Sequence, residues 1–151
     1  MKSKPTALLI SDHADEFFET AHAVFETLSV RTIRAQRCQE AASHLAAFPP
    51  PHVVLTDTTL FDATWEGVVD LARKAPGRVN VVVVSRIADL PLYLDVMSEG
   101  AFDFVTHSFT VQELVHVFRC ALDDAARSRS SKGDLTRHAE APGPLEPTPT
   151  V

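Results

Sequence analysis

The chain has 151 residues, of which 45% are hydrophobic, and a formal net charge of −6 with its histidines counted as neutral. A chain of this length is expected to form one domain with a substantial core. The acidic balance argues against sequence-independent nucleic-acid binding, because such binding requires a basic surface that neutralises phosphates.

The first apolar run, at residues 7–10, is typical of a buried strand and stops at Ser11 and Asp12. An uninterrupted run this short provides neither a signal-peptide core nor a membrane span. We therefore expect a protein of the cytoplasm that does not contact a membrane.

Strands and helices are predicted to alternate along the rest of the chain. The alternation of apolar and polar side chains at 30–35 is typical of an edge strand. The second helix is expected to bury Ala42 and Leu45 and to end before three prolines, whose rings cannot continue a helix. The predicted strands are 7–10, 30–35, 53–57, 79–84 and 102–106. The predicted helices are 14–28, 39–48, 65–74, 89–99 and 110 to about 126.

The predicted helix at 89–99 is unusually apolar. It has Pro91 in its first turn and Gly100 just past its end, which is the usual asymmetry of helix termini. Its apolar side chains leave little polar surface, so part of them is expected to stay exposed as a contact face. They are Leu90, Leu92, Tyr93, Leu94, Val96 and Met97.

From about Arg127 the composition changes to Ser, Lys, Gly and Pro, with few residues to bury. This predicts a folded domain at 1–126 and a disordered tail at 127–151, too poor in apolar residues to form a DNA-binding or catalytic module. Cys38 and Cys120 stand far apart without metal-ligand spacing, so we expect reduced thiols.

The alternation of strands and helices predicts a doubly wound α/β fold with five parallel strands, because strand–helix–strand crossovers are almost always right-handed. The second strand has edge character, and the first, third and fourth have central character. These features favour the strand order 2-1-3-4-5, a flavodoxin-like arrangement.

Several predicted strands end abruptly on a polar residue. In a parallel sheet these ends meet at one edge, where open α/β sheets bind ligands. The residues expected there are Asp12, His13, Asp57, Ser85 and His107.

This set of residues suits phosphoryl chemistry. A strand-end carboxylate such as Asp57 can become an aspartyl phosphate when a divalent cation, held by it and Asp12, neutralises the incoming group. The Ser85 hydroxyl could hydrogen-bond the phosphoryl oxygens, and a cation at position 107 could pair with them.

With these residues the chain resembles the receiver domain of bacterial two-component response regulators, over roughly residues 6–125. The resemblance rests on the segments 8–12, 53–60, 82–85 and 100–109. It implies a phosphoacceptor role for Asp57, a switch role for Phe104, and a weak Mg²⁺ site. The implied ligands of that metal are Asp12, Asp57, the backbone carbonyl of Thr59 and, where a second acid is usual, His13.

Two signature positions depart from the family pattern. His13 replaces an acid, and His107 followed by Ser108 replaces Lys-Pro. Loss of a carboxylate should weaken Mg²⁺ binding, and an imidazole ligand shifts preference toward transition metals, so Mn²⁺ or another divalent ion is an alternative. The proline and Asp-Gly usual after the phosphoacceptor are also absent.

The resemblance implies a stand-alone receiver that takes a phosphoryl group from a histidine kinase or phosphotransfer protein and signals by protein contact. Its partner would be a downstream protein, or a second copy bound through the 89–99 helix and the last helix. It would not be an enzyme beyond assisting its own phosphorylation and dephosphorylation. The alternative is a phosphorylation-independent pseudo-receiver that acts as an interaction module. A nucleotide- or flavin-binding enzyme is disfavoured, because the five glycines form neither a G-x-G-x-x-G motif nor a P-loop.

Overall fold

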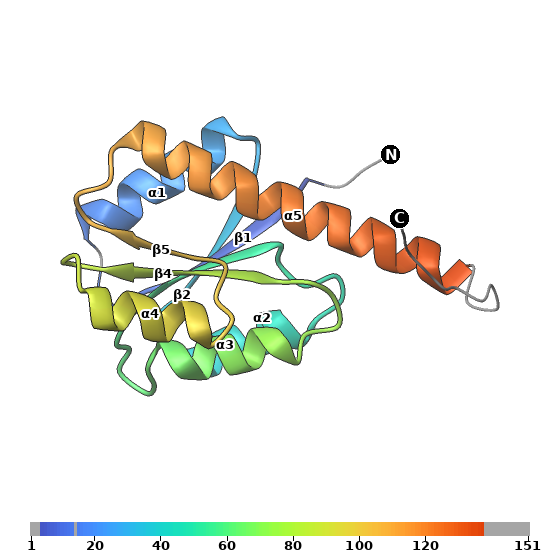
Figure 1. The fold of residues 1–151 in the computed structure, drawn as a ribbon, viewed down its shortest axis with the longest axis horizontal. Coiled ribbons are helices and arrows are strands. Elements are labelled where there is room, and N and C mark those ends of the chain that lie inside the picture. Colours follow the sequence, from blue (N-terminus) through green and yellow to red (C-terminus); the bar gives the residue numbers. More distant parts are fainter. Residues whose placement is uncertain (1–3, 14, 138–151) are drawn as a thin grey trace, which may run out of the picture.

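The computed structural model describes residues 4–13 and 15–137, with the backbone alone for 131–137 (Figure 1). The strands are β1 (Thr6–Ile10), β2 (Arg31–Ala35), β3 (Val53–Asp57), β4 (Asn80–Ser85) and β5 (Asp103–Thr106). The helices are α1 (Glu16–Thr27), α2 (Cys38–Ala46), α3 (Trp65–Arg73), α4 (Leu90–Ser98) and α5 (Val111–Arg137).

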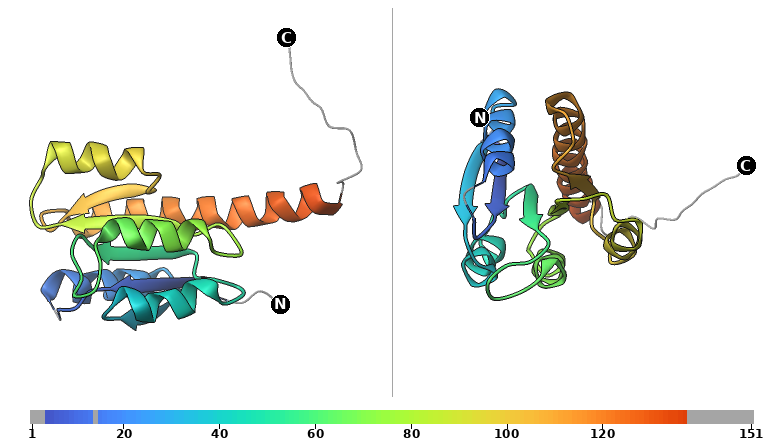
Figure 2. Two further views of the ribbon diagram at one scale, coloured as in Figure 1. Left: turned by 90° about the horizontal axis from the view of Figure 1, so that it is seen from below. Right: turned by 90° about the vertical axis from the view of Figure 1, so that its left-hand side faces the viewer.

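All five strands are parallel, in the order β2-β1-β3-β4-β5, as the sequence predicted. Helices α1 and α5 cover one face of the sheet, and α2, α3 and α4 cover the other (Figures 1 and 2). Each face has its own apolar core, because successive side chains of a strand point to opposite faces. The predicted doubly wound fold is confirmed.

The burial of the strands follows their composition. Every residue of β3 and β4 is buried, whereas β2 at the edge exposes Arg31 and Arg34 and buries only Ala35. Gly100 follows α4 with φ +101°, a backbone conformation that L side chains rarely adopt, which confirms the predicted end of that helix.

The structure corrects the predicted buried face of one helix and the predicted start of another. Helix α2 buries Ala41 and Leu45 rather than Ala42, because Ala41 and Leu45 lie one turn apart on the face toward the sheet. Helix α1 begins at Glu16, with Asp15 as its N-cap. Its predicted start at 14 was too early, since the Asp15 carboxylate accepts a hydrogen bond from the Phe18 N–H at 2.9 Å.

Helix α5 is longer than predicted. It continues to Arg137, so the first part of the predicted tail is helical, and the remainder, 138–151, lies outside the described residues. Arg129 anchors this extension, since its guanidinium donates to the carbonyl oxygens of Pro51 (2.7 Å) and Arg78 (2.8 Å). Composition alone could not predict these hydrogen bonds, because Pro51 and Arg78 are distant from Arg129 in the sequence.

Among the helices that the structure describes, none is long and apolar enough to cross a membrane.

Candidate functional site at the carboxyl edge of the sheet

The ends of the central strands bring the predicted site residues to one edge. Asp57 and Ser85 are the last residues of β3 and β4, which are neighbouring strands, and Asp12 follows the end of β1 on the other side of β3. The backbone N–H of His107 donates to the Ser85 carbonyl at 3.1 Å. Asp12, Asp57, Ser85 and His107 therefore share one edge, as predicted.

Asp57 is a buried carboxylate at the centre of this edge. Only 8% of the residue is exposed, and its Oδ1 accepts a hydrogen bond from the Thr58 N–H at 3.0 Å. Burial raises the pKa of Asp57 above its ordinary value, and the Asp15 carboxylate adds to this effect. The Thr58 hydrogen bond and the charges of Arg86 and His107 act in the opposite direction on this pKa.

Two further carboxylate oxygens lie buried at the same edge. Asp12 Oδ1 and Asp15 Oδ2 have no hydrogen-bond partner among the described residues. A buried carboxylate oxygen without a partner is costly, which indicates that a cation or donor belongs there.

The donor chemistry fits a hard divalent cation. No three His, Cys, Asp or Glu side chains of the described residues form a cluster able to hold a metal on their own. Mg²⁺ does not need one, because it commonly binds one or two carboxylates together with waters and phosphate oxygens. Asp12 and Asp57 would supply carboxylates to it.

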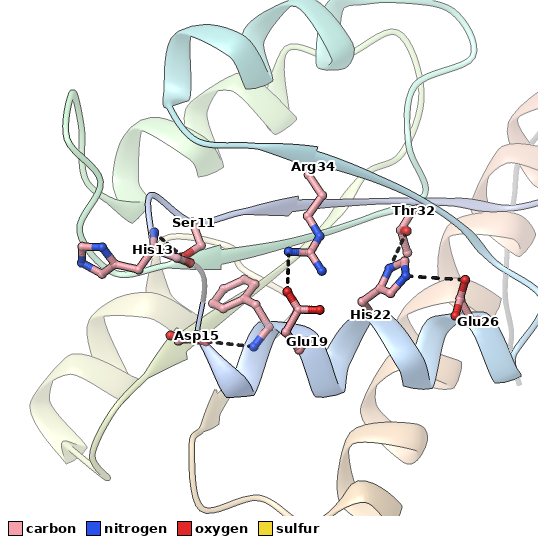
Figure 3. A network of polar contacts seen from close by, with 9 residues as sticks. Ser11, His13, Asp15, Glu19, His22, Glu26, Thr32 and Arg34 are labelled. Carbon is pink, nitrogen blue, oxygen red and sulfur yellow. Dashed lines mark hydrogen bonds and ion pairs between the residues drawn. The ribbon is translucent and has the colours of Figure 1, made fainter.

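His13 is the least suited of the predicted metal ligands. Its side chain is 64% exposed, and its Nδ1 lies 3.5 Å from Asp12 Oδ1, an ion pair only when the imidazole is protonated. Its backbone is held by Ser11, whose hydroxyl donates to the His13 carbonyl at 2.8 Å (Figure 3).

Thr59 lies two residues past the end of β3, where it forms an isolated bridge with Thr64. Its side chain is exposed. This placement leaves its backbone carbonyl as a candidate metal ligand.

The two hydroxyls at the ends of β4 and β5 are paired by register but differ in their contacts. Ser85 is buried, and its Oγ accepts a hydrogen bond from the Ile87 N–H at 3.3 Å, so its own proton remains available to a ligand. The Thr106 hydroxyl, opposite Ser85, is instead hydrogen-bonded to Ser108 at 2.7 Å.

The ring of His107 lies against α1. It stacks on Phe17, with 4.8 Å between the ring centroids and 11° between the planes. Its Nε2 is buried and lacks a hydrogen-bond partner among the described residues. The side chain therefore reaches the edge of the site but is held by an aromatic contact.

Phe104, the predicted switch aromatic, is buried in β5. Its ring makes an edge-to-face contact with Tyr93 of α4, with 5.8 Å between centroids. This contact links the strand that ends at the site to the exposed helix α4.

Sequence reasoning missed two residues at this edge, Asp15 and Arg86. Arg86 directly follows Ser85, and its Nη2 lies 3.9 Å from Asp15 Oδ2. The sequence carried a signal for each, since Asp15 lies in the first turn of a predicted helix and Arg86 directly follows Ser85, a predicted site residue at a strand end. Their proximity to each other and to Asp57 became visible only in the folded chain.

The fold matches a known class of structures. The chain resembles the signal receiver domain of an HD domain-containing protein from Pseudomonas fluorescens, with a TM-score of 0.74 and 17% identity over 86% of this chain and 95% of that one. It also resembles a response regulator from Thermotoga maritima, with a TM-score of 0.69 and 19% identity over 80% and 99% of the two chains.

A third neighbour is a CheY-like receiver domain protein from Methanospirillum hungatei, with a TM-score of 0.70 and 16% identity over 83% and 98% of the two chains. No family model and no curated protein matches the sequence. The chain therefore has the receiver-domain fold of response regulators, as the sequence resemblance predicted.

Proposed function

We propose that the chain is a phosphorelay receiver that accepts a phosphoryl group on Asp57. The observation that carries this proposal is a buried strand-end carboxylate that shares one edge of the sheet with Ser85 and with two buried carboxylate oxygens. Those two oxygens have no hydrogen-bond partner among the described residues. This arrangement has a nucleophile, candidate cation ligands and a hydroxyl donor at one edge of the sheet.

In the transfer step, an Asp57 carboxylate oxygen attacks the phosphorus of a phosphohistidine on a histidine kinase or phosphotransfer protein. The O–P bond forms, the P–N bond breaks, and the electron pair leaves with the imidazole nitrogen. Oδ1 accepts the Thr58 hydrogen bond, which leaves Oδ2 as the attacking atom. A bound Mg²⁺ would neutralise charge on the phosphoryl oxygens. The Ser85 hydroxyl would donate a hydrogen bond to one of them.

The output of such a receiver would be a protein contact made through α4, β5 and α5. On α4, Leu90, Tyr93 and Leu94 are exposed apolar side chains, and exposed apolar patches are typical of interaction sites. The Tyr93–Phe104 contact connects this surface to β5. A downstream protein or a second copy of the chain is the proposed partner.

A pseudo-receiver that works without phosphate is the second candidate. The placement of His107 favours it, because a ring stacked on Phe17 is not directed freely at Asp57. The buried oxygens of Asp12 and Asp15, which accept no hydrogen bond from the described residues, favour the phosphorylated receiver.

One experiment distinguishes the two. The protein is incubated with acetyl phosphate and Mg²⁺ or Mn²⁺, and its intact mass is measured beside Asp57→Asn and the matched control Asp70→Asn, an exposed aspartate of α3. A phosphoryl adduct on wild type and Asp70→Asn but not on Asp57→Asn supports the receiver. The absence of an adduct on every variant with both metals overturns it.

A further inference from the structure

Arg86 brings a permanent positive charge to the edge of the sheet. It follows Ser85 at the end of β4, and its Nη2 lies 3.9 Å from Asp15 Oδ2. The Arg86 side chain is 61% exposed, so it is free to change rotamer without disturbing the core.

Asp15 forms an ion pair with this arginine at the edge of the sheet that carries Asp57. One carboxylate oxygen of Asp15, Oδ1, is fixed by the Phe18 N–H at the start of α1 (Figure 3). The other, Oδ2, is buried, without a hydrogen-bond partner among the described residues, and is the atom nearest to Arg86. At 3.9 Å the pair is an ion pair rather than a tight hydrogen bond, so the guanidinium retains its donors.

The negative charges at this edge make a permanent cation favourable there. Asp12 and Asp15 contribute two acidic groups, and phosphorylation replaces the single negative charge of Asp57 with the charge of a phosphoryl group, about −1.5 to −2 at neutral pH. The imidazole of His107 is a cation only when protonated, whereas a guanidinium is charged throughout the physiological pH range. A guanidinium also presents its N–H donors in a planar fork that matches two phosphoryl oxygens.

We propose that Arg86, positioned by Asp15, is the cation that pairs with the phosphoryl group on Asp57, in place of a cation at position 107. This inference rests on the proposed function. When the phosphoryl group forms, the guanidinium moves from the Asp15 carboxylate to the phosphoryl oxygens, where it donates hydrogen bonds. Arg86 then contacts the reacting group, whereas Asp15 acts as a positioning residue.

The test measures the rate of adduct formation from acetyl phosphate with Mg²⁺ at pH 8.5, where histidine side chains are ordinarily neutral. Wild type, Arg86→Gln, Arg86→Lys and His107→Gln are compared by intact mass. The matched control is Arg73→Gln, because Arg73 is an exposed arginine that pairs with an aspartate on α3.

We expect Arg86→Gln to lower the rate at least about tenfold, and to lower it more than His107→Gln does. Arg86→Lys should restore part of the rate, because the positive charge returns without the planar fork of donors, and Arg73→Gln should match wild type. A merely structural role of Arg86 would not produce rescue by lysine.

Failure of this inference and failure of the proposed function give different results. An adduct that forms on Arg86→Gln at the wild-type rate overturns this inference and leaves the proposed function standing. The absence of an adduct on wild type overturns both. Because Arg86 is exposed, circular dichroism should confirm that each variant is folded.

Discussion

His52, in the loop before β3, faces Arg129 of α5 with 3.3 Å between the imidazole Nε2 and the guanidinium Nη1. The other ring nitrogen, Nδ1, accepts a hydrogen bond from the backbone N–H of Thr6. Burial and the neighbouring guanidinium lower the pKa of His52 to about 4. The imidazole is therefore neutral in the folded chain at physiological pH.

This relationship predicts a loss of stability in weak acid. The unfolded chain takes up a proton on His52 near pH 6.5 and the folded chain near 4, so the stabilisation is complete above 6.5 and is lost as the pH falls between these values. The loss should amount to about 1–2 kcal/mol after allowance for solvent screening. Urea unfolding of wild type and His52→Gln between pH 7.5 and 4 measures it.

The control for this prediction is His116→Gln, at an exposed position of α5. The free energy of unfolding of this variant should depend on pH as it does in wild type, because His52 is still present and still takes up a proton on unfolding. Equal pH dependence of wild type and His52→Gln would contradict the prediction.

Asp57→Asn is predicted to stabilise the chain at neutral pH. Folding raises the pKa of Asp57, so its favourable contribution is fully present only below about 3.8 and is lost as the pH rises through the folded-state pKa. At pH 7.5 the ionised carboxylate is therefore unfavourable, and asparagine removes its charge at nearly constant shape. Thermal unfolding at pH 7.5 should show a Tm for Asp57→Asn that is higher than that of wild type by roughly 2–5 °C. This difference in Tm should become smaller as the pH falls toward 4. A lower Tm at pH 7.5 would refute this explanation.

Arg129→Gln is predicted to destabilise the fold although the residue lies in the segment expected to be a tail. It removes charged hydrogen bonds to the Pro51 and Arg78 carbonyls, which should cost about 1–3 kcal/mol in the free energy of unfolding. The nearby exposed Arg127→Gln should change this free energy by less than about 0.5 kcal/mol. Denaturant unfolding of both variants decides whether the extension of α5 belongs to the folded domain.

Substitutions in helix α4 should lower the free energy of unfolding only on its buried face. Val96 is fully buried, so Val96→Ala should cost about 2 kcal/mol in the free energy of unfolding. Leu94 is 56% exposed, so Leu94→Ala should change it by less than about 0.5 kcal/mol. A large loss of stability in Leu94→Ala would show that this side chain belongs to the core and is not available as a contact surface.

Magnesium binding is predicted to change the fluorescence of Trp65, the single tryptophan of the chain. Its backbone N–H donates to the carbonyl of Thr58, the residue after Asp57, at 3.0 Å, so movement at the site reaches the indole. Titration with MgCl₂ should give a saturable change that is abolished or strongly weakened in Asp12→Asn. A response of Asp12→Asn equal to that of wild type would remove Asp12 from the metal site.

Much of the fold could be predicted from the sequence because its signals are local. Apolar runs such as 53–57 and 79–84, punctuated by prolines and helix caps, specify the elements and their order. The abrupt ends of those runs placed Asp12, Asp57 and Ser85 at one edge, because parallel strands bring their carboxyl ends together.

The tertiary structure decided what depends on contacts between distant segments. It paired Asp15 with Arg86, placed the His107 ring on Phe17, and anchored the helical extension through Arg129. Each interaction joins residues that are separated in the sequence by 71, 90 and 78 positions, respectively. Local periodicity carries no information about such partners, because only the packing of the complete sheet and its helices determines which side chains meet.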